Sequence, residues 1–406
     1  MKKLFSILYV LIVQIGFAQN EQYNDVVHYY HSQKNFNGIV LVATDGKIDY
    51  LTGIGISNRQ TGTTMNAKTK FKIASITKTF TAVLVLQLHQ QGKIDLNVPF
   101  GKYYPTYKGD AKDKVTIQQL LTYSSGIPNA VENLHLKPYQ LPLTLDEFID
   151  QYCSEKVAFT PGEKSNYSNT EYTILHKIIE NVSKTSFASL LQENILNPLQ
   201  MKNTGMLHAK DIIAGLSSSY TLEESTNQIT ADEPYFIENY FGSAAMYSTV
   251  EDLLTFNNAL LNNRLLNAST TNLLLQPNKQ LDGATLGGLW YSDGYGTFNK
   301  PFIYRTGGLL GSCSNWIHSI EDKKTIIVFN NVNGTNLYEL SEQLYRVSTG
   351  QKPTIPSYEK KDNNSKTVNL AAIKGTWVLD LRPDPNSAPY FKDFILTPTK
   401  GNEFEG

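Results

Sequence analysis

This chain of 406 residues has few cysteines and a small net charge. Two cysteines, Cys153 and Cys313, cannot build a disulfide framework or a zinc site with four thiolates, although a single bridge between them stays open. The formal net charge of −1 argues against the basic field of a nucleic-acid-binding protein and the acidic composition of a disordered tail. With 27 Gly and 16 Pro, the chain is neither collagen-like nor of low complexity.

A second group of absences concerns metal-binding and catalytic motifs. The sequence contains no H-E-x-x-H, paired C-x-x-C or H-x-H pattern, so no metal site is predicted. It contains no G-x-S-x-G elbow either, which disfavours an α/β-hydrolase. Hydrophobic residues make up 41% and charged residues 18%, which indicates a folded, soluble protein. The length leaves room for one large domain plus a small one, or for two mid-sized ones.

The amino terminus has the pattern of a targeting segment. The cationic Met1-Lys2-Lys3 precedes a mostly apolar stretch over residues 4–17, and small residues stand at Gly16 and Ala18. This pattern predicts a cleaved signal peptide over residues 1–18, with an uncleaved anchor as the alternative. The stretch is short for a membrane span, and no cysteine follows the cleavage site to carry a lipid. The mature chain is therefore expected in the periplasm or outside the cell, meeting the membrane only during export.

Short apolar runs and turn residues predict a series of strands and helices. The runs 36–43 and 48–56 flank the turn at Asp45-Gly46-Lys47 and indicate a hairpin. A helix is predicted over 75–91, and because its centre at 82–88 is almost wholly apolar, we expect it to be buried on all sides. Further helices are predicted over 169–182, 249–261 (opened by a capping box of Ser248 and Glu251) and 336–347, and further strands over 289–298, 302–305, 314–319 and 324–330.

This order of elements predicts the domain organisation. Strands lie at both ends and helices in the middle, which favours an α/β domain of the α+β type over residues 19–350. Its antiparallel sheet would be formed by both chain ends and flanked by helices, with an all-helical insertion. Residues 351–366, with Pro353 and Pro356, have the composition of a linker. Residues 367–406 are too few to bury a core alone, so they are expected to form a short β-rich appendage that packs on the main domain or is cut short here.

The first candidate for chemistry is Ser75-Ile76-Thr77-Lys78, at the head of the buried helix. The S-x-x-K pattern alone is weak, and a second copy at Ser357–Lys360 stands in the linker with no helix behind it. At helical spacing the Ser75 and Lys78 side chains lie on one face. A capping role for Ser75 is the ordinary alternative. However, a cation in the first turn opposes the helix dipole, and burial would lower its pKa, as the activation of a hydroxyl nucleophile requires.

Two further segments carry polar groups suited to such a site. The loop 160–169 ends in Tyr167, whose hydroxyl can relay a proton, and Asn169, whose amide can hold Lys78 or a substrate carbonyl. Alone, this segment would be a turn with Asn169 as helix cap. The segment Tyr304–Gly308 is a strand running into glycines, whose N–H groups can hold an oxyanion, and a plain strand end is the alternative.

Together these segments resemble the motifs of a known superfamily. Ser75-x-x-Lys78, Tyr167-Ser168-Asn169 and Arg305-Thr306-Gly307 occur in the order and at roughly the separations of serine β-lactamases and penicillin-binding proteins. The sequence is most similar to the branch of class C β-lactamases, D,D-carboxypeptidases and family VIII esterases. The segments 120–128, 197–205 and 242–252 resemble it too, so the similarity covers about residues 25–347. It implies a β-lactamase/transpeptidase-like fold without a metal or organic cofactor.

The resemblance also implies roles for individual residues. Ser75 would be the acylated nucleophile, and Lys78 with Tyr167 would activate it and pass its proton to the leaving group. Asn169 would orient Lys78 and the substrate amide. Substrate binding and the oxyanion hole would involve Asn169, Arg305, Thr306 and Gly307, with the N–H groups of Ser75 and Gly308 holding the oxyanion.

Arg305 departs from the family, where Lys or His is usual. Arginine keeps the charge but does not release its proton, so we expect Arg305 to act electrostatically and to anchor substrate, and the case for strong β-lactam hydrolysis is weakened. The predicted function is an exported serine hydrolase that forms an acyl-enzyme with an amide or ester. A D,D-carboxypeptidase or D-amino-acid peptidase acting on a small molecule or a peptidoglycan stem peptide fits this prediction. The alternatives are a carboxylesterase of the same fold and a non-catalytic, penicillin-binding-like regulatory protein; no nucleic-acid partner is expected.

Overall fold

The computed structural model describes residues 19–129, 134, 136–223 and 225–355, together with strands at 375–380, 391–398 and 404–405. The chain divides into two compact units, Met1–Pro356 and Ser357–Gly406. The predicted signal peptide 1–18 and most of the predicted linker 351–366 lie outside the described residues. Both cysteines, Cys153 and Cys313, are free, so the bridge left open by the sequence is not formed.

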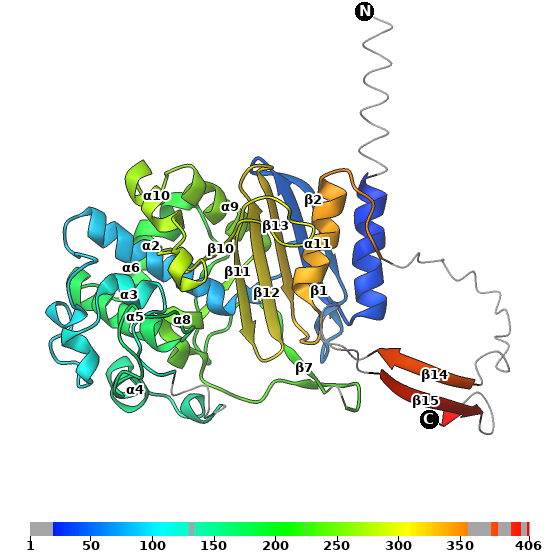
Figure 1. The fold of residues 1–406 in the computed structure, drawn as a ribbon, viewed down its shortest axis with the longest axis horizontal. Coiled ribbons are helices and arrows are strands. Elements are labelled where there is room, and N and C mark those ends of the chain that lie inside the picture. The colour runs from blue at the N-terminus through cyan, green and yellow to red at the C-terminus, as the bar shows by residue number, and fades with distance from the viewer. Residues whose placement is uncertain are drawn as a thin grey trace, which may run out of the picture. The chain divides into compact units, whose positions relative to one another are not determined.

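The first unit is built around one antiparallel sheet of six strands (Figure 1). Its order is β10-β11-β12-β13-β1-β2. The strands are β1 (Gly38–Thr44), β2 (Lys47–Ile54), β10 (Trp290–Ser292), β11 (Phe302–Leu309), β12 (Ser312–Ser319) and β13 (Lys324–Asn330). The two ends of the chain meet where β1 pairs with β13, in a register running from Gly38 opposite Asn330 to Thr44 opposite Lys324. The predicted sheet, formed by both ends of the domain, is confirmed.

Two helices cover one face of this sheet (Figure 1). They are the helix at residues 19–33 and α11 (Leu337–Ser348), which share a hydrophobic cluster with the strand residues Val40 and Val328. The alternate residues of β1, such as Leu41, pack into the larger core on the other face. Because both faces are covered, β1 reads as a continuous apolar run rather than an alternating one. The sequence did not predict the helix at 19–33.

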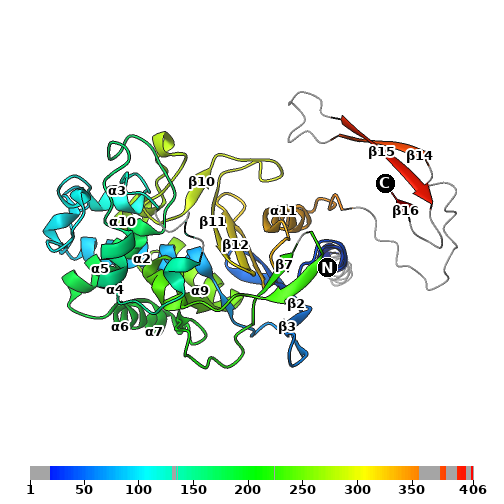
Figure 2. The ribbon, with the colours of Figure 1, turned by 90° about the horizontal axis from the view of Figure 1, so that it is seen from below.

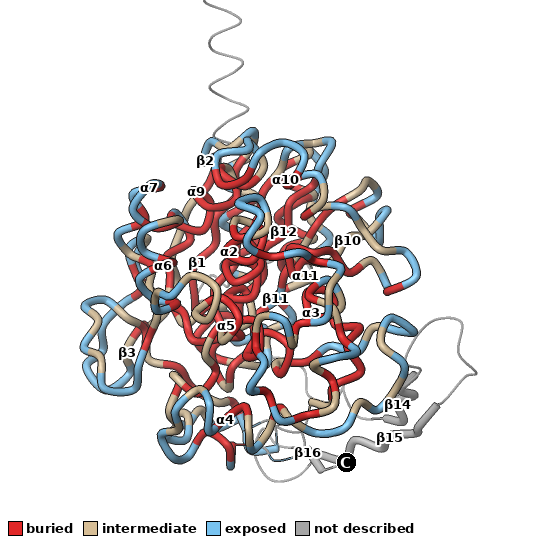
Figure 3. Tube along the Cα trace, turned by 90° about the vertical axis from the view of Figure 1, so that its left-hand side faces the viewer, coloured by how far each residue is buried: buried red, intermediate tan, exposed pale blue. Residues whose placement is uncertain are grey.

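The other face of the sheet packs against the helical region, seen from a second side in Figure 2. Its α-helices are α2 (Thr77–Gln90), α3 (Ile117–Leu121), α4 (Leu145–Tyr152), α5 (Thr170–Ser183), α6 (Phe187–Leu191), α7 (Asn197–Leu199), α8 (Phe241–Ala244), α9 (Val250–Leu261) and α10 (Ala268–Leu275). Shorter turns are η1 (Ala74–Ile76), η2 (Phe100–Lys102), η3 (Asp110–Asp113), η5 (Lys137–Tyr139), the π-helical η6 (Gln192–Leu196), η7 (Ile237–Tyr240) and η8 (Lys279–Leu281). As predicted, α2 is buried over most of its length and lies in the interior (Figure 3).

Several boundaries differ from the prediction. The cap of α9 is Thr249, whose hydroxyl accepts from the N–H of Asp252 at 3.2 Å, because Ser248 is already the last residue of β9 (Met246–Ser248). Strand β11 continues through the glycines to Leu309, and β10 is shorter than the predicted run.

The insertion between the two parts of the sheet is mainly helical, but short strands interrupt it. They are β3 (Ile56–Asn58), β4 (Thr63–Thr64), β5 (Phe71–Lys72), β6 (Gly205–Met206), β7 (Tyr220–Glu223), β8 (Gln228–Ala231) and β9. Strand β5 leads directly into η1 and pairs with β9. The nucleophile segment is therefore held between a strand pair and the buried helix.

In the second unit, the described residues form three antiparallel strands. These are β14 (Gly375–Asp380), β15 (Phe391–Pro398) and β16 (Phe404–Glu405). The β14–β15 register runs from Gly375 opposite Leu396 to Asp380 opposite Phe391. None of the helices in the described part of the chain combines the length and hydropathy needed to cross a membrane.

Candidate active site

Ser75 lies in a strained turn between β5 and α2. The preceding Ala74 has a φ of 45°, a left-handed conformation that a residue with a side chain adopts only when its surroundings impose it. Two neighbouring hydroxyls fix the strand before it, because Ser312 Oγ donates to the carbonyl of Lys72 at 2.9 Å and Ser314 Oγ donates to that of Ile73 at 3.2 Å. The cap position of α2 is Ile76, without a side-chain hydrogen bond. Ser75 is therefore not a helix cap, and its hydroxyl is available for chemistry.

Lys78 is fully buried beneath Ser75. Its Nζ donates to Ser75 Oγ at 3.2 Å, to Asn169 Oδ1 at 2.6 Å and to the carbonyl of Ser243 at 3.0 Å. Burial lowers the pKa of Lys78 to about 8; Tyr167 works in the opposite direction, and the positive charge of Arg305 adds to the lowering. An amine with this pKa, in contact with a hydroxyl, can exchange a proton with it near neutral pH.

Tyr167 approaches Ser75 from the other side. Its hydroxyl lies 2.7 Å from Ser75 Oγ and accepts a hydrogen bond from Arg305 Nη2 at 3.0 Å. Burial alone would raise the pKa of Tyr167, but the charges of Lys78 and Arg305 outweigh it and lower that pKa to about 8. The predicted nucleophile and its two predicted proton carriers thus share one chain of hydrogen bonds.

Asn169 stands at the start of α5, yet its side chain makes no capping hydrogen bond. Its Oδ1 instead accepts from Lys78. The structure therefore places the amide on the ammonium, as expected from the sequence, and not on the helix end.

Arg305 is almost fully buried, and its guanidinium is directed at protein groups. Its Nε donates to the carbonyl of Ser75, Nη1 to the hydroxyl of Tyr123 and Nη2 to that of Tyr167, each at 3.0 Å. This geometry fits the expected electrostatic role. It does not favour the expected anchoring of substrate, because three N–H groups already serve acceptors within the protein.

The glycines of β11 bring the strand close to the nucleophile. A Cβ at Gly307 would overlap the carbonyl oxygen of Ile73 and stand 3.2 Å from the backbone nitrogen of Ser75. A Cβ at Gly308 would meet nothing within 4 Å, and Gly308 is exposed, as is Thr306. Among the described strands, β10 pairs only with the first residues of β11, Phe302–Tyr304, so the segment with the glycines is an open edge. The oxyanion hole of the Ser75 and Gly308 N–H groups stays a prediction.

Three groups at the site were not predicted. The Ser243 carbonyl holds Lys78, and Tyr123 holds Arg305. Glu171 is buried beside the site, accepts from Ser125 Oγ at 2.8 Å, and has its pKa raised to about 7 by burial. The only signal in the sequence was that Tyr123, Ser125 and Ser243 fall within segments similar to the superfamily.

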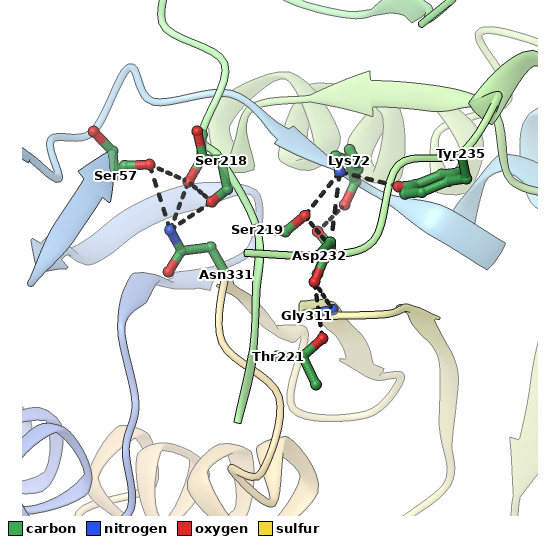
Figure 4. Close-up of polar contacts among 11 residues, drawn as sticks. Ser57, Lys72, Ser218, Ser219, Thr221, Asp232, Tyr235, Gly311 and Asn331 are labelled. Atoms are coloured by element: carbon green, nitrogen blue, oxygen red, sulfur yellow. Dashed lines mark hydrogen bonds and ion pairs between the residues drawn. The ribbon is translucent and has the colours of Figure 1, made fainter. Parts of the chain in front are cut away.

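A cluster of polar contacts surrounds Lys72 and Asp232 (Figure 4). Lys72, three residues before the nucleophile, donates to Ser219 Oγ at 2.8 Å and to the Tyr235 hydroxyl at 3.0 Å, and its Nζ lies 4.0 Å from Asp232. Asp232 also accepts from the N–H of Gly311, in the turn between β11 and β12, at 3.0 Å. The cluster therefore ties the strand before Ser75 to the hairpin that carries the glycines.

The assembled groups suit acyl transfer. A serine hydroxyl contacts two groups whose pKa values lie near 8, a fixed cation contacts one of them, and an open strand edge passes the nucleophile. No three His, Cys, Asp or Glu side chains of the described residues gather in a way that could hold a metal ion.

Known proteins are similar to this chain in sequence and in fold. Protein flp of Staphylococcus aureus strain MW2 is 29% identical over 319 residues, covering 75% of this chain and 61% of that protein, so the chain spans about three fifths of its length. Teichoic acid D-alanine hydrolase of Staphylococcus aureus strain MRSA252 is 26% identical over 304 residues, covering 74% of this chain and 72% of that protein.

Among solved structures, D-amino acid amidase from Ochrobactrum anthropi SV3 superposes with a TM-score of 0.72 at 20% identity, covering 82% of this chain and 99% of that one. A penicillin-binding protein from Bacillus halodurans gives a TM-score of 0.68 at 23% identity, covering 79% and 98%. These structures share the fold. The sequence profile of the beta-lactamase family matches residues 23–351, which span the sheet, α2 and every residue of the site. This match covers most of the chain, and the serine, lysine and tyrosine within it are in hydrogen-bond contact, so the chain belongs to the beta-lactamase family.

Proposed function

We propose that this protein is an exported hydrolase that removes a D-amino acyl group from an ester or amide by way of an acyl-enzyme at Ser75. The observation that carries the proposal is the placement of Ser75 Oγ 2.7 Å from the Tyr167 hydroxyl and 3.2 Å from Lys78 Nζ. Because the pKa values of Lys78 and Tyr167 both lie near 8, part of the population has lost one proton from this pair near neutral pH, and that form can act as the general base that a serine requires.

The proposed reaction has two halves. Tyr167, as phenolate beside the Lys78 ammonium, takes the proton of Ser75 while Oγ bonds to the substrate carbonyl carbon. The charge that develops on the carbonyl oxygen is held by the N–H groups of Ser75 and Gly308. The C–O or C–N bond then breaks, and Tyr167 returns the proton to the leaving alcohol or amine. Water repeats these steps on the acyl-enzyme, giving the free acid and restoring Ser75.

The choice of substrate class rests on the charges of the site. Arg305 is the cation that the family resemblance would assign to a substrate carboxylate, but its three hydrogen bonds are made within the protein. This favours an ester or amide with no carboxylate next to the scissile bond over a peptide ending in D-Ala-D-Ala. The names of teichoic acid D-alanine hydrolase and D-amino acid amidase point in the same direction. Residues 1–18 support export, and a mature chain that begins at Gln19 in secreted material would test it.

The test combines covalent labelling with a substrate panel. A fluorophosphonate probe should label the wild type and not Ser75→Ala. Ser357→Ala is the matched control, because Ser357 belongs to the second S-x-x-K copy and should label normally. Full labelling of Ser75→Ala would refute the nucleophile assignment. The panel compares the p-nitroanilides of D- and L-alanine, p-nitrophenyl acetate, nitrocefin and a D-Ala-D-Ala peptide. Faster turnover of the D-alanine anilide supports the proposal, whereas turnover of p-nitrophenyl acetate alone would identify a carboxylesterase.

A further inference from the structure

Tyr123 contacts Arg305, which hydrogen-bonds to the Tyr167 hydroxyl, and also the loop that carries Tyr167. It follows α3, is fully buried, and its hydroxyl accepts from Arg305 Nη1 at 3.0 Å. Its backbone carbonyl accepts from the N–H of Asn166, the residue before Tyr167, at 2.8 Å. One residue therefore contacts the cation that acts on Tyr167 and the loop that carries Tyr167.

The side chain of Tyr123 is held in place by other rings. It stacks on Trp290 with centroids 5.6 Å apart and an angle of 15° between the planes, and it packs against Tyr172 at 5.4 Å and Tyr167 at 5.0 Å. Its backbone has a φ of 57°, an uncommon conformation for a bulky residue. A bulky residue kept in this conformation indicates that its surroundings determine its placement closely.

Arg305 depends on this placement for its direction. The guanidinium is planar, and its Nε, Nη1 and Nη2 serve three acceptors at one distance, on Ser75, Tyr123 and Tyr167. Without the Tyr123 hydroxyl, Arg305 Nη1 loses its acceptor inside the protein, and the guanidinium can rotate toward a different acceptor. We propose that Tyr123 is a positioning residue that directs the Arg305 guanidinium at Tyr167 and thereby sets the pH range in which Ser75 is acylated. This rests on the proposed function of Ser75.

The direction of the effect follows from the charges around Tyr167. The titratable and charged groups that face it or its partners are Lys78 on α2, Arg305 on β11, Tyr123 after α3, Tyr172 and Glu171 on α5, and Tyr139 on η5. Lys78 and Arg305 lower the pKa of Tyr167. If Arg305 turns away, less of the phenolate is present near neutral pH. The rising part of the pH profile then moves upward by about 0.5–1 pH unit, so the rate near pH 7 falls about three- to tenfold.

The experiment measures the rate of fluorophosphonate labelling of the full chain from about pH 6 to about pH 10. In this reaction Ser75 Oγ bonds to phosphorus, fluoride leaves, and the serine proton passes to Tyr167. Tyr123→Phe removes only the hydroxyl and should shift the profile upward. Tyr107→Phe is the matched control, because Tyr107 is likewise buried but donates to the carbonyl of Cys153 at 2.5 Å and makes no hydrogen bond to Arg305, Tyr123 or Tyr167. It should leave the profile in place.

Two further variants separate positioning from structure. In an Arg305→Ala background, Tyr123→Phe should produce no additional shift, because the residue through which it acts is gone. Arg305→Lys keeps a cation near neutral pH but cannot reach three acceptors, and it should shift the profile even if Tyr123→Phe does not fold. An unmoved profile in Tyr123→Phe or Arg305→Lys, or an equal shift in Tyr107→Phe, would overturn the role of Tyr123. A folded wild type that takes no label would instead refute the proposed function.

Discussion

Replacement of Lys78 by methionine separates catalysis from stability. Methionine has a similar length and no charge, so Lys78→Met removes the ammonium while largely filling its space. The buried Nζ makes three hydrogen bonds, and its pKa is lowered from 10.5 to about 8, first by burial. We expect labelling of Ser75 to be lost, because the proton carrier beneath it is gone.

The effect on stability can be worked from the same pKa. Above about pH 8 the folded chain has released a proton that the unfolded chain retains up to about pH 10.5, so the free energy of unfolding of the wild type rises with pH in this interval. The full difference corresponds to roughly 3 kcal/mol, of which about 2 kcal/mol falls between about pH 7 and about pH 9.5. Near pH 7, Lys78→Met removes the cost of burying the charged ammonium and also removes three hydrogen bonds of about 1 kcal/mol each. The two effects are similar in size and opposite in sign, so they nearly cancel. The lowered pKa of Tyr167 acts with the same sign.

Denaturant unfolding at the two pH values provides the measurement. Lys78→Met should match the wild type within about 1 kcal/mol near pH 7 and be less stable by about 2 kcal/mol near pH 9.5. Lys72→Met is the control for loss of a buried lysine, because it breaks the contacts with Ser219 and Tyr235 but removes no group that touches Ser75 Oγ, so it should lower the labelling rate far less than Lys78→Met does. A stability difference independent of pH, or a loss above about 4 kcal/mol near pH 7, would refute the reasoning.

Two other predictions concern the glycines and the pH profile. Gly307→Ala should destabilise the fold by about 1–3 kcal/mol and lose most labelling, because the added Cβ overlaps the Ile73 carbonyl and pushes β11 away from Ser75. In Gly308→Ala the added Cβ meets no atom within 4 Å, so this variant should keep the stability of the wild type. Equal losses of stability in the two variants, measured by thermal unfolding, would contradict this contrast. Because the pKa of Tyr167 is about 8, the wild-type labelling rate should rise about tenfold per pH unit below about pH 8 and then level off. A labelling rate that does not change between about pH 6 and about pH 9 would exclude Tyr167 as the base.

Much of the fold followed from local patterns in the sequence. The hairpin of β1 and β2 was predicted because a turn separates two β-rich runs, and α2 because its centre is apolar on every side. Local patterns did not predict the boundary between β9 and α9, where one residue could belong to either element. The Ser248 hydroxyl bonds to Thr204 at 2.7 Å, and the backbone pairing of β9 moves the cap of α9 to Thr249. The helix at 19–33 was missed because its apolar stripe of Tyr23, Val26 and Tyr30 directly follows the targeting pattern.

The parts of the site that were missed have no motif in the sequence. Ser243 contributes a backbone carbonyl, which every residue possesses. Ala74 contributes a strained backbone conformation, which cannot be predicted from its residue type. Tyr123 was visible only as a member of a similar segment, because its partner Arg305 is 182 residues away. Residues that react could be found from their types and spacing, whereas residues that position them require the tertiary structure.

Arginine at position 305 has a consequence for how protons move at the site. A lysine there would titrate in the same range as Lys78 once buried, so two amines and a phenol would compete for protons. A guanidinium stays charged throughout this range. Lys78 and Tyr167 are then the groups in contact with Ser75 whose pKa values lie near 8, and the fixed charge of Arg305 biases the proton toward leaving Tyr167. Because that bias depends on the direction of the guanidinium as well as on its charge, a fully buried residue such as Tyr123 can control the rate at which Ser75 reacts.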